Sequence, residues 1–161
     1  NDAQLQDYVY KNQLAAYRFL TEQAKDPEVK AIAAKEHPDD FATQKYVYEN
    51  QLEAKAHMAK VADAEVKAIA VREHPDDFST QKYVYENQAA AKAYMATVKD
   101  EEVKKLALSE HPGDFSTQKY VYDNQVEAKA FMAAQPESKK KARVVREHPG
   151  DYSTQKYLLA N

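Results

Sequence analysis

The sequence predicts an all-α protein made of tandem helical hairpins stacked as an α-solenoid. The first observation is a period of 37 residues, which separates His37, His74, His111 and His148, and also Tyr46, Tyr83, Tyr120 and Tyr157. The second is the composition: only two glycines occur in 161 residues, and Ala, Lys, Glu and Gln abound, which favours helix. A fixed period in a helix-forming sequence is typical of hairpins that bury their apolar faces against neighbours.

The period predicts a single array over residues 1–161. Its units cover approximately 2–39, 40–76, 77–113 and 114–150, and a partial helix follows over 151–161. The first unit holds one extra residue, since Tyr8 precedes Tyr46 by 38 positions. Because the chain does not begin with Met, we expect a processed or trimmed product.

A long helix opens each unit. In the second unit it is expected over residues 43–62, where Val47, Ala54, Met58 and Val61 fall on one helical face. The long helix of the third unit starts after a cap that is either Asp77 or Ser79. If Ser79 is the cap, Phe78 and Tyr83 occupy the two positions of a hydrophobic staple.

A short helix closes each unit. Asp63 is its expected N-cap, and Val66, Ile69 and Ala70 form its buried stripe. It must end before Pro75, since proline pushes the preceding residue out of the α region. In the last unit Lys140 replaces the valine of the stripe among further basic residues: Lys139, Lys141, Arg143 and Arg146. We interpret this cluster as a solvated terminal cap rather than a phosphate-binding patch.

The Glu-His-Pro-Asp-Asp phrase between hairpins contains potential ligands for a divalent cation. The candidate ligands are His37, His74, His111, His148, Asp40, Asp77, Asp114 and Asp151. The first aspartate of the phrase is replaced by Gly113 and Gly150 in the later units, and an Asp/Gly exchange suits a turn. A structural turn is therefore favoured, and a metal-binding repeat stays as the alternative.

The Tyr-Val-Tyr-x-Asn-Gln phrase supplies candidate partner-binding residues: Tyr46, Tyr48, Tyr83, Tyr85, Tyr120, Tyr122, Asn50, Asn87 and Asn124. Tyrosines two apart on a helix point in different directions, so one of each pair should pack and the other should be exposed. The amides could form ladders that join the repeats. The alternative is an aromatic, amide-bearing strip for a peptide or glycan.

One position accepts any flat ring, because His57 aligns with Tyr94 and Phe131. We expect it to pack in the core or at an interface, beside the methionines that follow it. The phrase from the turn into the first two turns of the long helix barely varies between copies. The sequence predicts that this constant segment forms the junction between successive hairpins.

The remaining composition restricts the function classes. The net charge is −3, there is no cysteine, and no apolar run reaches the roughly 20 residues of a membrane span. Phosphate-binding loops, nucleophile elbows and paired-histidine motifs are missing from the sequence. We predict a non-enzymatic binding or spacer module without a cofactor. An enzyme with an unrecognised carboxylate and histidine site is a further alternative.

The predicted partner is a protein or glycan, without nucleic acid and without membrane insertion, and self-association is left open. A chain without cysteine fits both the cytosol and many bacterial surface proteins. Of these settings, a secreted or cell-surface location is favoured over the cytoplasm.

Overall fold

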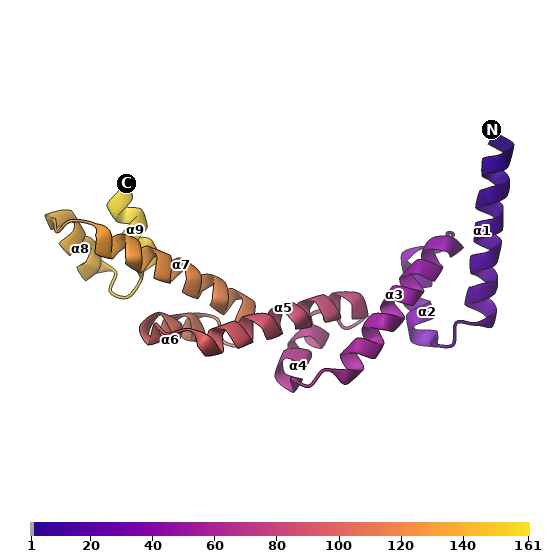
Figure 1. The fold of residues 1–161 in the computed structure, drawn as a ribbon, viewed down its shortest axis with the longest axis horizontal. Helices are drawn as coiled ribbons and strands as arrows, with labels where there is room; N and C mark the ends of the chain where they lie inside the picture. Colours follow the sequence, from indigo (N-terminus) through magenta and orange to yellow (C-terminus); the bar gives the residue numbers. More distant parts are fainter. Residues whose placement is uncertain (1) are drawn as a thin grey trace. The chain divides into compact units, whose positions relative to one another are not determined.

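A computed structural model describes residues 2–161, and these residues form nine α-helices joined by short connections (Figure 1). Helices of 20 or 21 residues alternate with helices of 9 or 10 residues, and the last helix has 9. Their bounds are α1 Asp2–Glu22, α2 Pro27–Glu36, α3 Phe41–Lys60, α4 Ala64–Glu73, α5 Phe78–Thr97, α6 Glu101–Glu110, α7 Phe115–Ala134, α8 Lys139–Glu147 and α9 Tyr152–Ala160. The predicted fold class of repeated helical hairpins is confirmed.

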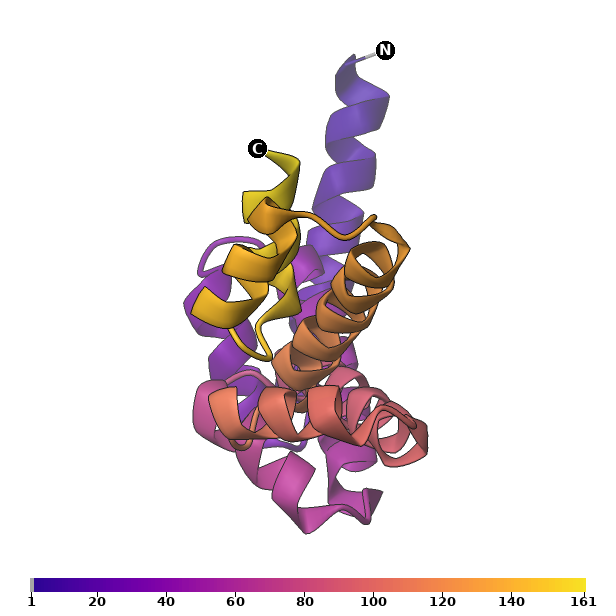
Figure 2. The same cartoon turned by 90° about the vertical axis from the view of Figure 1, so that its left-hand side faces the viewer.

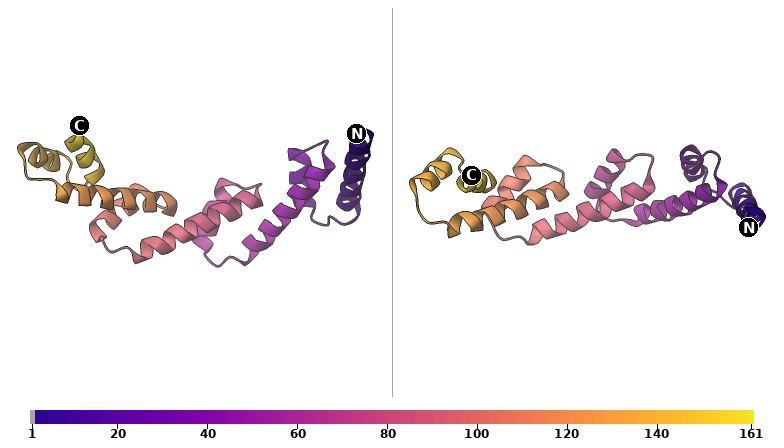
Figure 3. Two further views of the ribbon diagram at one scale, coloured as in Figure 1. Left: turned by 45° about the horizontal axis from the view of Figure 1, so that its top comes forward. Right: turned by 90° about the horizontal axis from the view of Figure 1, so that it is seen from above.

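The chain divides into two compact units, one ending at Tyr85 and the other running Glu86–Asn161. In the first unit, α1 and α2 both pack against α3. In the second, α6 and α9 both pack against α7, and α8 packs against α9. Figure 2 shows α8 beside α9, and Figure 3 shows α2 beside α3. Thus α3 is covered by α1 and by the short helix α2, and α7 is covered by the short helix α6 and by α9.

The short helices begin and end as the sequence predicts. The carboxylate of Asp63 caps α4 by accepting a hydrogen bond from the N–H of Val66 at 3.1 Å, and His74 is the C-cap that precedes Pro75. Asp26 and Asp100 cap α2 and α6 in the same way, whereas Ser138 takes this role in α8. An oxygen-bearing side chain at this position satisfies a backbone N–H that has no partner inside the helix.

The long helices are capped by the second aspartate of the turn. Asp77 accepts from the N–H of Thr80 at 3.0 Å, so it is the cap, and Ser79 lies inside α5. The staple that depended on Ser79 as cap therefore does not apply. The same contact recurs at Asp40, Asp114 and Asp151, and α3 begins at Phe41, two residues before the predicted start.

The turn between successive hairpins adopts two backbone conformations. Gly113 and Gly150 adopt φ of 80° and 79°, in the left-handed region that glycine enters without steric cost. No other described residue has positive φ, so Asp39 and Asp76 build the equivalent turn from ordinary backbone angles. The Asp/Gly exchange is therefore a change of turn conformation as well as of side chain.

The core of each compact unit combines aliphatic side chains with a buried tyrosine, Tyr48 in the first and Tyr122 in the second. Val66, Ile69 and Ala70 of α4 are buried, which confirms the predicted stripe. Ala54 and Met58 on α3 are buried as well, and Met95 and Met132 repeat the methionine position. In α8 only Val144 is buried among the described residues, in keeping with the loss of the apolar stripe there. Within residues 2–161 no helix has the length and apolar character required to cross a membrane.

Candidate functional site

A glutamine on each long helix joins it to the start of the next long helix. In the compact unit Glu86–Asn161, Nε2 of Gln125 donates to Asp151 at 3.1 Å, and its Oε1 accepts from the N–H of Ser153 at 3.1 Å. Gln13, Gln51 and Gln88 make the same two contacts with the turns that follow them. The glutamines therefore bind helix caps, and the predicted ladder of amides bonded to one another is wrong.

A second glutamine is buried inside each junction. Gln118 is 2% exposed, and its Nε2 donates to the carbonyl of His111 at 2.7 Å. The same bond recurs at Gln44, Gln81 and Gln155. The apolar pattern of the sequence does not reveal this residue because it is polar. Its recurrence at a step of 37 within the constant phrase was the available signal.

The second tyrosine of the Tyr-Val-Tyr triplets at 46–48, 83–85 and 120–122 is also part of the junction. Tyr122 is 7% exposed, and its hydroxyl accepts from the N–H of Asp100 at 3.2 Å. Tyr48 and Tyr85 make the same bond to Asp26 and Asp63. These tyrosines contact the start of the preceding short helix through their hydroxyl oxygens.

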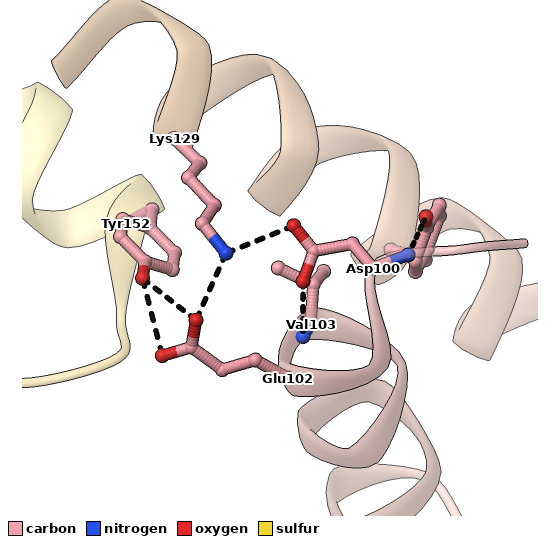
Figure 4. A network of polar contacts seen from close by, with 6 residues as sticks. Asp100, Glu102, Val103, Lys129 and Tyr152 are labelled. Carbon is pink, nitrogen blue, oxygen red and sulfur yellow. Dashed lines mark hydrogen bonds and ion pairs between the residues drawn. The ribbon is translucent and has the colours of Figure 1, made fainter. Parts of the chain in front are cut away.

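An ion-pair network closes the junction from the outside (Figure 4). Lys129 donates to Asp100 at 2.9 Å and to Glu102 at 2.8 Å, and Tyr152 donates to Glu102 at 3.1 Å. Bonds to Glu102 and then to Asp100 raise the pKa of Lys129, and the Lys129 bond lowers the pKa of Asp100. In the compact unit that ends at Tyr85, Lys55 forms the same ion pairs with Asp26 and Glu28. Because the lysines are about one-third exposed, we expect a modest contribution to stability.

The position that accepts any flat ring lies under a lysine of the next long helix. Lys119 sits 4.6 Å above the ring centroid of Tyr94, whose edge meets Tyr122. The same cation–π contact joins Lys45 to Phe19 and Lys156 to Phe131. The expected interface packing of this ring position is confirmed, and it marks another contact between successive repeats.

The residues proposed as metal ligands are used differently. Asp77 accepts hydrogen bonds from Thr80 and Gln51, and Asp114 and Asp151 do the same with their counterparts. Across residues 2–161, no three His, Asp or Glu side chains lie where they could hold one metal ion. The structure thus places these aspartates at helix starts, where they act as caps.

The capping bonds shift the pKa of the aspartates downward. Bonds from the Thr43 hydroxyl, Gln13 and the Thr43 N–H lower the pKa of Asp40 to about 2. Burial works to raise the pKa of Asp114, but the bonds from Thr117 and Gln88 together outweigh it and lower it. An ionised carboxylate is the better acceptor, so the junctions hold these groups in the charged form.

The first prediction concerns acid stability. A folded pKa below the unfolded value of about 3.9 gives stability that is complete above about pH 5 and is lost as pH falls through about 4 toward 2. The free energy of unfolding, measured in urea by circular dichroism at pH 7, 5 and 3, should fall only at pH 3. In Asp114→Asn the side chain can still accept a hydrogen bond but no longer titrates, so the free energy should fall less at pH 3. Asp39 is exposed, and Asp39→Asn should behave as wild type. Equal falls in all three proteins would contradict the capping role.

After these contacts are assigned, one recurring aromatic set remains without a partner. We call Tyr46, Tyr83, Tyr120 and Tyr157 the free tyrosines. Their exposed fractions are 65–68%, and within residues 2–161 their side chains form no hydrogen bond, ion pair or ring contact. Asn50, Asn87 and Asn124 lie one helical turn further along the same faces, and their amides also have no partner within the described chain.

In the compact unit Glu86–Asn161, two of the free tyrosines, Tyr120 and Tyr157, line a groove between α7 and α9. It has a volume of about 460 Å³. Tyr120 and Asn124 contribute from α7, Tyr157 contributes from α9, and Asn161 contributes as the C-cap of α9. Glu127 and Lys156 also line it and form an ion pair at 2.5 Å. The groove therefore combines exposed aromatic rings, amides and a balanced charge pair.

Comparison with known proteins adds no family to this description. No protein-family model, no curated protein and no solved structure matches the chain.

Proposed function

We propose that this protein is a non-enzymatic binding module, and that the free tyrosines with their neighbouring asparagines form its binding surface for a protein or glycan. The observation that supports this is a large, exposed aromatic side chain at the same position in successive repeats, which forms no hydrogen bond, ion pair or ring contact with the described residues. Tyrosine provides a large contact area at low entropic cost, which makes it a frequent anchor of binding surfaces.

A purely structural spacer would use every recurring side chain in contacts between repeats. That holds for Gln118, Gln125 and Tyr122, which are all bonded across a junction. It does not hold for Tyr120. Exposed positions on the long helices vary between repeats, as Glu53, Ala90 and Glu127 show, whereas the tyrosine does not. The constancy of Tyr120 and its counterparts therefore needs a cause outside the fold.

The enzyme and metal alternatives find less support. Asp77 and its counterparts are the carboxylates that recur beside the histidines, and each holds a helix cap with a lowered pKa. A general acid needs the opposite shift. A secreted or cell-surface setting, in which such a module would meet peptides or glycans, is part of the proposal.

The test is a binding screen with a matched pair of proteins. We expect wild type to bind members of a peptide array or a glycan array. The fourfold variant Tyr46→Ala, Tyr83→Ala, Tyr120→Ala and Tyr157→Ala should lose at least about tenfold in affinity, because exposed aromatic anchors dominate such surfaces. Its melting temperature should stay close to that of wild type, since surface truncations seldom change stability by more than about 0.5 kcal/mol.

Tyr10→Ala is the control, because Tyr10 is also 65% exposed but aligns with the junction tyrosine Tyr48. It should bind as wild type does. An absence of ligands on both arrays, or full binding by the fourfold variant, would overturn the proposed function.

A further inference from the structure

We propose that the first half of α1 is a docking face for a further helical hairpin of this same repeat, joined to the chain ahead of Asp2. The side chains that define this face are Gln6 and Tyr10, and we call it the α1 face. They align, at a spacing of 38, with the junction residues Gln44 and Tyr48 of α3. The inference does not depend on the binding surface formed by the free tyrosines.

The α1 face is exposed, although the aligned residues of α3 are buried. Tyr10 is 65% exposed, whereas Tyr48 is 3% exposed. Gln6 is exposed as well, and neither Gln6 nor Tyr10 forms a hydrogen bond within residues 2–161. All of residues 2–12 are exposed, so no described element covers this half of the helix. The α1 face therefore has the side chains of a junction without the hairpin that fills one.

The other junctions show what such a face contacts. In α3, Nε2 of Gln44 donates to the His37 carbonyl at 2.6 Å, and the Tyr48 hydroxyl accepts from the N–H of Asp26 at 3.2 Å. His37 is the C-cap of α2 and Asp26 is its N-cap. The same two bonds join α5 to α4 and α7 to α6. The matching partner thus presents an N–H and a carbonyl at the two ends of a short helix.

This requirement separates a repeat hairpin from other partners. The short helix α2 has 10 residues, and a helix of that length spans about 15 Å. The partner must hold its N-cap N–H and its C-cap carbonyl at that separation, both directed at one neighbouring helix. A hairpin of this repeat has that geometry in each junction described above, and an extended peptide or a glycan has no short helix that could fix it.

A second copy of the chain has no vacant hairpin to offer. Within the described residues, the hairpin of α1 and α2 already holds α3. The hairpins that begin with α3 and α5 hold the starts of α5 and α7. The last hairpin, formed by α7 and α8, is covered by α9. The occupant that we infer is therefore a further hairpin placed before α1 as α2 is placed before α3.

The charge of α1 specifies this hairpin further. Asp7 stands where the other long helices carry a lysine: Lys45, Lys82, Lys119 and Lys156. Lys82 reaches back to the preceding long helix and pairs with Glu53 at 3.2 Å. An aspartate at this position would be repelled by such a glutamate, whereas the equivalent Ala90 of α5 carries no charge. A hairpin like that of residues 77–113 is therefore the better match for α1.

A chain extended by a second copy of residues 77–113 ahead of Asp2 tests the inference. The added segment supplies α5 and α6 as they stand before α7, and Asp2 takes the position of Asp114. Amide hydrogen exchange over residues 2–12, followed by mass spectrometry, should be at least about tenfold slower than in the 161-residue chain, because a covered helix opens less often. In the extended chain, Tyr10→Ala should restore fast exchange there.

Tyr8→Ala is the matched control. Tyr8 is 63% exposed and aligns with Tyr46, one of the free tyrosines, so this variant of the extended chain should keep the slow exchange. Exchange over α7 should be the same in all of these proteins, which establishes that they are folded. Fast exchange over residues 2–12 of the extended chain, or equal effects of Tyr8→Ala and Tyr10→Ala, would overturn the inference.

Sedimentation velocity of the 161-residue chain distinguishes the two sources of a hairpin. We expect a monomer, because every described hairpin is already filled. Self-association that Tyr10→Ala abolishes would make a second copy the occupant and would overturn the inference. Neither result bears on the proposed function, which the peptide and glycan arrays test through the free tyrosines.

Discussion

Gln118→Glu should destabilise the protein by about 3 kcal/mol or more at pH 7, because it places a carboxylate where no donor is available. Gln118 is 2% exposed, its Nε2 donates to the His111 carbonyl at 2.7 Å, and its Oε1 is buried without a hydrogen-bond partner in the described structure. An ionised glutamate at this site would face the carbonyl oxygen with an oxygen of its own. The free energy of unfolding, measured in urea by circular dichroism, reports the loss.

The same variant has a pH signature. Burial raises the folded pKa of an introduced glutamate above its unfolded value of about 4.3, so its destabilisation is greatest above the folded pKa. As pH falls toward about 4 the group protonates, its O–H can donate to His111, and the difference from wild type should shrink. The exposed Gln4→Glu is the control and should change stability by less than about 0.5 kcal/mol. A buried variant that behaves like this control at every pH would contradict the role assigned to Gln118.

The local signals in the sequence predict the helix ends well. Asp63 caps α4 and His74 ends it, because capping and the restriction before Pro75 act over a few neighbouring residues. The choice between Asp77 and Ser79 stayed open in the sequence, since both side chains can cap a helix. The contact with Thr80 and the bond from Gln51 decide in favour of Asp77.

The contacts between repeats were less accessible to sequence reasoning. Gln51 was expected to meet other amides, but its partners are Asp77 and the N–H of Ser79, 26 and 28 residues further along. Gln118 escaped notice because a polar side chain does not contribute to an apolar period. Such partners are set by how successive helices pack, which the period of 37 residues predicts only in outline.

For the Tyr-Val-Tyr triplet, the sequence predicts that one tyrosine is buried and one is exposed, but not which one. Helical geometry required one tyrosine to pack and the other to be exposed, and the structure agrees, with Tyr122 at 7% and Tyr120 at 68% exposure. Geometry alone could not assign the two roles. The Asp100 N–H that Tyr122 reaches lies at the start of the preceding short helix, and this contact decides the assignment.

We infer that the constant phrase combines side chains that hold the junction with side chains left for a partner, and the two tyrosines of α7 test this most directly. Tyr122→Ala removes a buried ring that packs with Met95, Val103 and Ala107, together with the acceptor for Asp100. It should cost about 3 to 5 kcal/mol. Tyr120→Ala removes an exposed ring and should change stability by less than about 0.5 kcal/mol.

The deciding measurement is the free energy of unfolding of these two variants, determined side by side in urea at pH 7. A large loss for Tyr122→Ala together with an unchanged value for Tyr120→Ala is the result expected from the structure. Losses of similar size would show that Tyr120 is consumed by the fold, and would contradict both its assignment as a free side chain and the binding surface built on it.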